Sequence, residues 1–166
     1  NTFRFLWLIA IVMIVFGIIL GIADKFGKSG RDLSTLTPQH GFAYGFAQAR
    51  ALVPGVSRSG ATIAMGRVLG YTRESALRYS FLLAVPAVFG SGFYELRTAI
   101  GESDPSAPYS LVETFGATIV AFLVGYAVIA WLMRFIATKS FMPFIVYRIV
   151  LGTGILILLA TGTINA

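Results

Sequence analysis

The chain has 166 residues, of which 57% are hydrophobic and 12% are charged, and its mean hydropathy is +0.81. Soluble domains typically carry about 25% charged residues, so this composition excludes an ordinary water-soluble domain. The net charge of +6 would suggest nucleic-acid binding in a soluble protein. Here the basic residues stand in short loops between apolar segments, so we expect no nucleic-acid partner and take the charge as a signal of membrane orientation. The chain has no cysteine, which excludes disulfides and thiolate metal sites.

The first apolar segment predicts a transmembrane helix over residues 5–23. It is uncharged and has close to the roughly 20 apolar residues that a membrane span requires. A polar loop follows, from Asp24 to His40. The chain begins with Asn1 rather than Met, so we expect it to be a piece of a longer protein.

Residues 41–70 are apolar but interrupted, and they predict a re-entrant pair of short helices. Two uncharged runs, 41–49 and 59–66, flank a break that contains Pro54 and Gly55. Neither run is long enough to cross a bilayer, and broken backbone at membrane depth is tolerated where it is buried in protein or lines a wet cavity. The alternative is one kinked span with two arginines, which is disfavoured by the cost of charge in the bilayer.

Three further spans follow, at 76–97, 111–133 and 141–164. Pro86 falls inside the first of them, where a kink is tolerated. The predicted fold class is therefore an all-α integral membrane protein, a single domain of four transmembrane helices and one re-entrant helix hairpin.

The distribution of basic residues predicts the orientation of the chain. If the hairpin enters and leaves on one side, most cations share that side, which the positive-inside rule makes cytoplasmic. Arg4, Arg97, the acidic loop at 102–104 and both chain ends then lie on the other side. The predicted cytoplasmic cations are Lys25, Lys28, Arg31, Arg67, Arg73, Arg78, Arg134 and Lys139.

The second half of the hairpin predicts an anion site. Ser59 and Gly60 are typical of a helix start, with Ser59 as the N-cap, and helix N-termini bind anions through free N–H groups. Arg58 adds a permanent planar charge that suits bidentate phosphate contact, and Ser57 and Thr62 add hydroxyls. The pattern fits a phosphate or diphosphate whose lipid tail stays in the bilayer.

Each of these residues also has a structural interpretation. Glycine, serine and threonine allow close helix packing, and Arg58 would then pair with an acid elsewhere. Arg148 and Arg50 are charges within apolar segments, and each is either a substrate-binding residue or a structural counter-ion. Gln48 would either hydrogen-bond at the hairpin tip or pack, and we expect His40 to be mostly solvated.

Three segments carry a family resemblance: PGVSRSGATI at 54–63, YSFLLAVPAVFG at 79–90 and SFMPFIVYRI at 140–149. In order and spacing they resemble the C-terminal part of bacterial undecaprenyl-diphosphate phosphatases of the type linked to bacitracin resistance. The resemblance covers essentially the whole chain. The combination of segments is specific, whereas SRSG alone would be a weak signal.

The resemblance implies a multi-pass hydrolase of the bacterial inner (plasma) membrane that recycles the lipid carrier of peptidoglycan synthesis. It would hydrolyse undecaprenyl diphosphate to undecaprenyl phosphate and inorganic phosphate, with Mg²⁺ or Ca²⁺. The family's fold has two inverted repeats, each with a re-entrant helix pair. Its motif arginine falls on Arg58 and its flanking serines on Ser57 and Ser59, which we expect to be catalytic. We expect Gly60, Thr62, Arg148 and Gln48 to bind substrate.

The chain departs from the family pattern in one large respect. The family's first repeat, with its glutamate-rich stretch and its PVSSTGH-like motif, is absent here. The general base and the metal ligands would lie in that half, since Glu74, Glu95 and Glu113 stand alone at span ends. We therefore expect this chain to need the absent N-terminal half or a homo-oligomeric partner.

Two other functions remain open from the sequence. A lipid-phosphate flippase would use the same anion-binding tip without hydrolysis. A non-catalytic membrane subunit would be completed by a separately encoded partner.

Overall fold

The computed structural model describes residues 2–28, 30–101 and 111–163. Over these residues the chain forms six α-helices, two short 3₁₀ helices and one isolated β-bridge. The structure therefore confirms the all-α class.

Four of the helices are long: α1 (Thr2–Phe26), α4 (Arg73–Gly101), α5 (Leu111–Thr138) and α6 (Met142–Ala160). Each is long and apolar enough to cross a membrane, and at most 22% of the residues in each apolar window are buried within the chain. Apolar side chains that face outward along a whole helix are stable in lipid and not in water. The chain is accordingly a membrane protein with four candidate spans.

The interrupted segment forms two short helices, α2 (Pro38–Ala49) and α3 (Arg58–Val68), with the 3₁₀ turn η2 (Arg50–Leu52) between them. The helices have 12 and 11 residues. At a rise of about 1.5 Å per residue each is well short of the ~30 Å hydrocarbon core. The chain reverses after Pro54 at Gly55, whose φ of +92° is a left-handed conformation that favours glycine.

The start of α3 differs from the sequence prediction. The helix begins at Arg58, and its N-cap is Ser57. Ser59, which the sequence predicted as the N-cap, already lies in the first turn, so that prediction is wrong by two residues. The reason is that any serine before the apolar run satisfies the capping preference, and the backbone path after Gly55 selects the earlier one.

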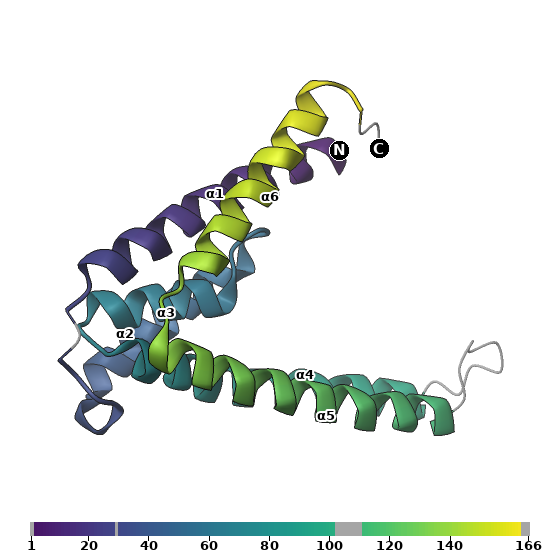
Figure 1. The fold of residues 1–166 in the computed structure, drawn as a ribbon. Helices are drawn as coiled ribbons and strands as arrows, with labels where there is room; N and C mark the ends of the chain where they lie inside the picture. The colour runs from purple at the N-terminus through teal and green to yellow at the C-terminus, as the bar shows by residue number, and fades with distance from the viewer. Residues whose placement is uncertain (1, 29, 102–110, 164–166) are drawn as a thin grey trace.

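Figure 1 shows the long helices as two pairs, α1 with α6 and α4 with α5. The pairs diverge from the end of the molecule that holds α2 and α3. Helix α3 is central, since it contacts α1, α2 and α4. One end of every long helix lies at this same end of the molecule, and α3 lies between the two pairs (Figure 1).

A buried ion cluster joins the helices where they converge. The Asp24 carboxylate, 4% exposed, lies 2.6 Å from Nε of Arg73 and 3.4 Å from Nε of Arg67. It also accepts a hydrogen bond of 3.4 Å from the amide of Phe141. Burial lowers the pKa of the Arg67 guanidinium, but arginine stays protonated in proteins. One carboxylate thus ties together α1, α3, α4 and the start of α6.

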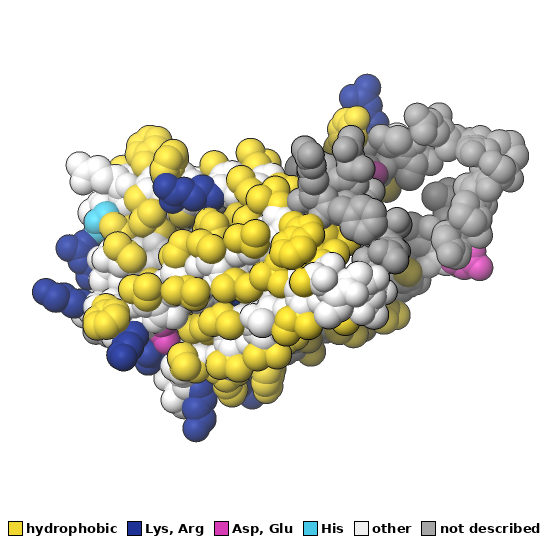
Figure 2. Space-filling view, turned by 90° about the horizontal axis from the view of Figure 1, so that it is seen from above, with side chains coloured by type: hydrophobic (Ala, Val, Ile, Leu, Met, Phe, Trp, Pro, Cys, Tyr) yellow, Lys and Arg dark blue, Asp and Glu magenta, His cyan; other side chains and the backbone are white. Residues whose placement is uncertain are grey.

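Basic side chains gather at the converging end. On the face in Figure 2, most of the visible lysine and arginine side chains lie at this end, with a band of hydrophobic side chains beyond them. The positive-inside rule associates such an end with the cytoplasm, and the orientation in a membrane stays a prediction. The acidic loop at 102–104, which the sequence placed on the opposite side, lies outside the described residues, as does the side chain of Arg4.

Candidate functional site

The first turn of α3 presents free backbone amides at the hairpin tip. Ser57 Oγ accepts a hydrogen bond of 3.1 Å from the amide of Gly60, and it lies 3.3 Å from Ser59 Oγ. The first amides of an α-helix have no intrahelical acceptor. With Gly60 occupied by the cap, the amides of Arg58 and Ser59 are the ones left for a ligand. Together with the positive end of the helix dipole they favour an anion here.

Arg148 reaches the same tip from α6. Its Nη2 donates a hydrogen bond of 2.9 Å to the carbonyl oxygen of Gly55, across 93 residues of sequence. A guanidinium has five N–H donors, and this bond uses one of them. Arg148 therefore fixes the turn before α3 and brings a permanent positive charge beside it.

These groups line a cavity of about 270 Å³ between α1, α3, α4, α5 and α6. Its polar lining includes four residues that the sequence predicted: Ser57, Ser59, Gly60 and Arg148. Its remaining walls are almost entirely apolar. They are formed by Leu20, Ile63, Leu77, Phe81, Leu132, Phe141, Phe144 and Tyr147.

Arg58 lines a second, neighbouring hollow rather than the cavity of the serines. This hollow has a volume of about 550 Å³, and Arg58 and Arg78 are its charged residues. Phe81 lines both spaces. The rest of the hollow is an apolar surface of α4 and α5, made of Leu82, Ala84, Val85, Val88, Phe89, Ile129 and Met133. Among the described residues Arg58 forms no ion pair with an acid, so the alternative of a structural counter-ion is not what the structure shows.

The structure does not support Thr62 as a substrate-binding residue. Its side chain is fully buried, and its hydroxyl lies 2.6 Å from Ser80 Oγ and 3.0 Å from the carbonyl oxygen of Arg58. One helical turn beyond the N-cap, Thr62 faces α4 rather than the tip. It positions α3 against α4.

Gln48, Arg50 and His40 lie away from the tip cavity. Gln48 Oε1 is buried and has no hydrogen-bond partner among the described residues. The Arg50 guanidinium lies 4.5 Å from the centre of the Phe46 ring. His40 is half-buried, with Nδ1 2.7 Å from the Tyr71 hydroxyl and Nε2 3.2 Å from Arg31 Nη1. The expectation of a mostly solvated histidine is therefore wrong, because His40 lies in the first turn of α2 and packs against Tyr71.

Sequence reasoning missed three residues near the tip. Tyr147 lines the serine cavity beside Arg148, and Arg78 lines the Arg58 hollow. Ser80 holds Thr62. Arg78 carried a signal, since a charge at the start of an apolar span faces protein or water rather than lipid. Tyr147 and Ser80 lie within two of the segments that carry the resemblance, but neither was singled out as a site residue.

The tip is not built as a metal site. Among the described residues no group of three histidine, aspartate or glutamate side chains is placed to hold a metal ion. The charged groups at the tip, Arg58 and Arg148, are cations, which repel a divalent metal and attract its anionic ligand. The described residues at the tip therefore do not fit a divalent metal by themselves.

Comparison with known proteins shows the family of this chain. Residues 1–154 match the family described as "Bacitracin resistance protein BacA". The chain is 53% identical over its whole length to the undecaprenyl-diphosphatase of Pseudarthrobacter chlorophenolicus and 56% identical to that of Micrococcus luteus. It is 54% identical to undecaprenyl-diphosphatase 2 of Agrobacterium fabrum. The chain spans about three fifths (59–60%) of the length of these relatives.

Proposed function

This chain belongs to the bacitracin resistance protein BacA family, and on that premise we propose that it supplies the diphosphate-binding half of an undecaprenyl-diphosphate phosphatase. The observation that carries the proposal is the tip of the hairpin. There the N-terminus of α3, Arg148 and Arg58 place positive charge beside two spaces with apolar walls. A lipid diphosphate needs positive charge for its head group and an adjacent apolar surface for its polyprenyl chain.

The diphosphate lies at the first turn of α3 in this proposal. The amides of Arg58 and Ser59 and the guanidinium groups of Arg58 and Arg148 contact its oxygens. The polyprenyl chain follows the apolar surface of α4 and α5 that begins at Phe81. Because α4 and α5 are themselves candidate spans, the tail would stay at membrane depth while the head group reaches the tip.

In the reaction, water attacks the terminal phosphorus and the bond from that phosphorus to the bridging oxygen breaks. The products are inorganic phosphate and undecaprenyl phosphate. Phosphoryl transfer depends on positioning and on stabilising charge over the phosphoryl oxygens, which Arg58 and the α3 amides would do. We place the general base, and the carboxylate ligands of Mg²⁺ or Ca²⁺, in the part of the protein that this chain lacks.

The cellular setting follows from the same proposal. The enzyme would act in the bacterial inner membrane, regenerating the lipid carrier of peptidoglycan synthesis. Its partners would be the substrate, the bilayer and either the absent N-terminal half or a second copy of the chain.

A second candidate function is transport of the lipid diphosphate without hydrolysis. The observation that favours it is that neither space at the tip is lined by a described histidine, aspartate or glutamate. A binding tip without a base would suffice for a flippase or for a non-catalytic subunit of a larger complex.

Phosphate release from undecaprenyl diphosphate in detergent, with Mg²⁺ or Ca²⁺, tests the proposal. The samples are this chain alone, the longer protein with its upstream region restored, and the longer protein with Arg58→Ala, Arg58→Lys or Arg97→Ala. We expect only the restored protein and its Arg97→Ala control to be active. Arg58→Ala should lose about 10²–10³-fold, and Arg58→Lys should also fail because a point charge does not reproduce a bidentate contact.

Full activity of Arg58→Lys would overturn the role of Arg58. If the restored protein binds the lipid diphosphate but releases no phosphate, the transport function replaces the phosphatase.

A further inference from the structure

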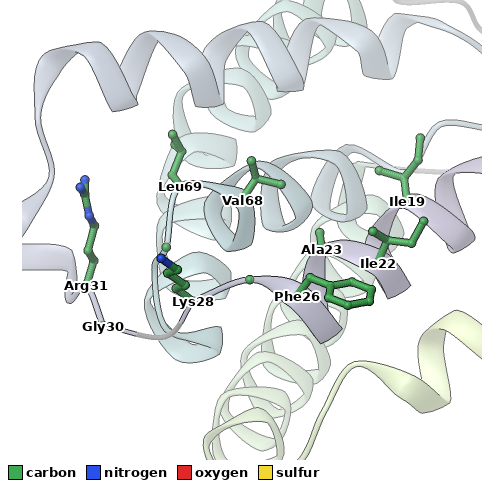
Figure 3. A pocket seen from close by; sticks show the side chains of 11 residues that line it. Ile19, Ile22, Ala23, Phe26, Lys28, Gly30, Arg31, Val68 and Leu69 are labelled. Atoms are coloured by element: carbon green, nitrogen blue, oxygen red, sulfur yellow. The ribbon is translucent and has the colours of Figure 1, made fainter.

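A large hollow of the described chain lies away from the tip, at the end where the basic residues gather. Its volume is about 830 Å³. The end of α1, the end of α3 and the loop after α1 enclose it, as Figure 3 shows. Nothing in the proposed phosphatase reaction uses this space. Its lining is Ile19, Ile22, Ala23, Phe26, Gly27, Lys28, Gly30, Arg31, Val68, Leu69 and Gly70.

One side of this space, which we call the basal hollow, is apolar and exposed. Phe26 and Val68 are 72% and 69% exposed, and Ile22 is more than half exposed. In Figure 3 these side chains come from α1 and α3 and lie along the same flank of the hollow. Large apolar side chains exposed at the end of a candidate span are stable against hydrocarbon rather than water.

The other side is cationic. Lys28 and Arg31 line the hollow, and Lys25 Nζ lies 5.6 Å from the centre of the Phe26 ring. The nearby acids do not cancel these charges at the hollow. Asp24 is buried and held by two arginines, and Asp32 lines a different depression. An anion is therefore attracted to the polar rim formed by Lys28 and Arg31, on the other side of the hollow from the apolar flank.

The rim is held in place by backbone contacts. The amides of Gly30 and Arg31 both donate to the carbonyl oxygen of Gly70, at 3.2 and 3.0 Å, and the amide of Thr72 donates to the carbonyl oxygen of Arg31 at 3.0 Å. The Arg31 side chain is oriented further by His40, 3.2 Å from its Nη1. The loop that carries the cations is thus fixed to the junction of α3 and α4.

We propose that the basal hollow binds an anionic glycerophospholipid of the leaflet on the basic side of the membrane. The lipid phosphate contacts Lys28 and Arg31, and its acyl chains lie on Ile22, Phe26 and Val68. Basic pockets beside transmembrane helices on the cytoplasmic side are suited to anionic head groups, and here the cations and the apolar flank are adjacent. The site lies at the far end of α3 from Arg58, so it goes beyond the diphosphate site and does not depend on it.

Lipid retention by the longer protein tests this. The protein is purified in detergent, mixed with equal amounts of phosphatidylglycerol and phosphatidylcholine, and the lipids that remain bound are counted by native mass spectrometry. The variants are Lys28→Gln, Lys28→Gln with Arg31→Gln, and Lys139→Gln as a control at the same end but outside the hollow. We expect the preference for phosphatidylglycerol to fall about fivefold for each charge removed from the hollow and to persist in Lys139→Gln.

A further variant separates a lipid site from a simple anion site. Val68→Ser keeps every charge, and we expect it to weaken retention of phosphatidylglycerol because it removes apolar contact. Equal retention in Lys28→Gln and the unchanged protein would overturn the proposal, as would an equal loss in Lys139→Gln. Displacement of the lipid by millimolar inorganic phosphate, with no effect of Val68→Ser, would show a free-anion site instead.

Discussion

At the scale of single residues, buried charges are stabilised by one carboxylate shared between two arginines and by hydrogen bonds to backbone carbonyls. Arg67, 2% exposed, faces Asp24 and also donates to the carbonyl oxygens of Tyr71 at 2.6 Å and of Gly27 at 2.8 Å. Arg148 donates to the carbonyl oxygen of Gly55. In both cases the arginine fixes an irregular stretch of backbone that flanks α3.

Replacing Asp24 with asparagine is expected to destabilise the protein strongly. The change removes the carboxylate but leaves Arg67 charged and buried, and breaking such a pair costs about 3–5 kcal/mol. The measurement is the midpoint of thermal unfolding in detergent for Asp24→Asn, with Asp32→Asn, an exposed aspartate of the next loop, as the matched control. Equal midpoints for the two variants would contradict a structural role for the cluster.

At the scale of the elements, α3 packs against three helices, α1, α2 and α4, and small residues on α3 allow this close packing. A methyl group at Gly66 would meet the Tyr44 hydroxyl from α2 and lie 2.8 Å from Cβ of Ala76 on α4. Burial raises the pKa of the Tyr44 hydroxyl, which stays neutral and has no hydrogen-bond partner among the described residues. Helices α2 and α4 therefore approach α3 as closely as they do because residue 66 has no side chain.

Gly66→Ala is expected to cost about 1–3 kcal/mol through overpacking. Gly45→Ala is the matched control, because a methyl group there meets nothing within 4 Å. Chemical unfolding in detergent of both variants measures the difference. Adding Tyr44→Phe to Gly66→Ala should restore part of the loss, since it removes the hydroxyl but leaves Ala76 in place. A Gly66→Ala protein as stable as Gly45→Ala would show that the three helices are not in close contact.

At the scale of the whole molecule, two helix pairs diverge from one basic end with α3 between them (Figures 1 and 2). The loops after α1 and after α5 both lie at that end, whereas the end of α6 lies at the other (Figure 1). In this arrangement the chain enters the membrane with α2 and leaves it with α3 on the same side. A full crossing would put the loops after α1 and after α5 on opposite faces.

Cysteine labelling tests the arrangement directly, because the chain has no native cysteine. Single cysteines at Lys28, Lys139 and Thr163 are treated with a membrane-impermeant maleimide in right-side-out and inverted vesicles. We expect Lys28→Cys and Lys139→Cys to be labelled from the same face and Thr163→Cys from the opposite face. Labelling of the first two from opposite faces would show that the hairpin crosses the membrane.

The sequence by itself determined the helical elements, and it predicted the type of chemistry. Long uncharged runs predicted where the long helices lie. In a bilayer the backbone N–H and C=O groups must bond to one another, and a helix satisfies them within one segment. The break at Pro54 and Gly55 predicted the hairpin, and Arg58 with the neighbouring serines predicted a phosphate-binding helix start. These signals are local, so they can be found without knowing how the helices pack.

Only the tertiary structure decided which distant residues meet. It placed Arg148 on the carbonyl oxygen of Gly55, gave Asp24 two arginine partners and joined Lys28 and Arg31 to the apolar flank of α1 and α3. It also turned Thr62 away from the tip toward Ser80. Contacts of this kind depend on the rotation of each helix and on its neighbours. Uniformly apolar spans carry little information about either, because in lipid every face of such a helix is equally acceptable.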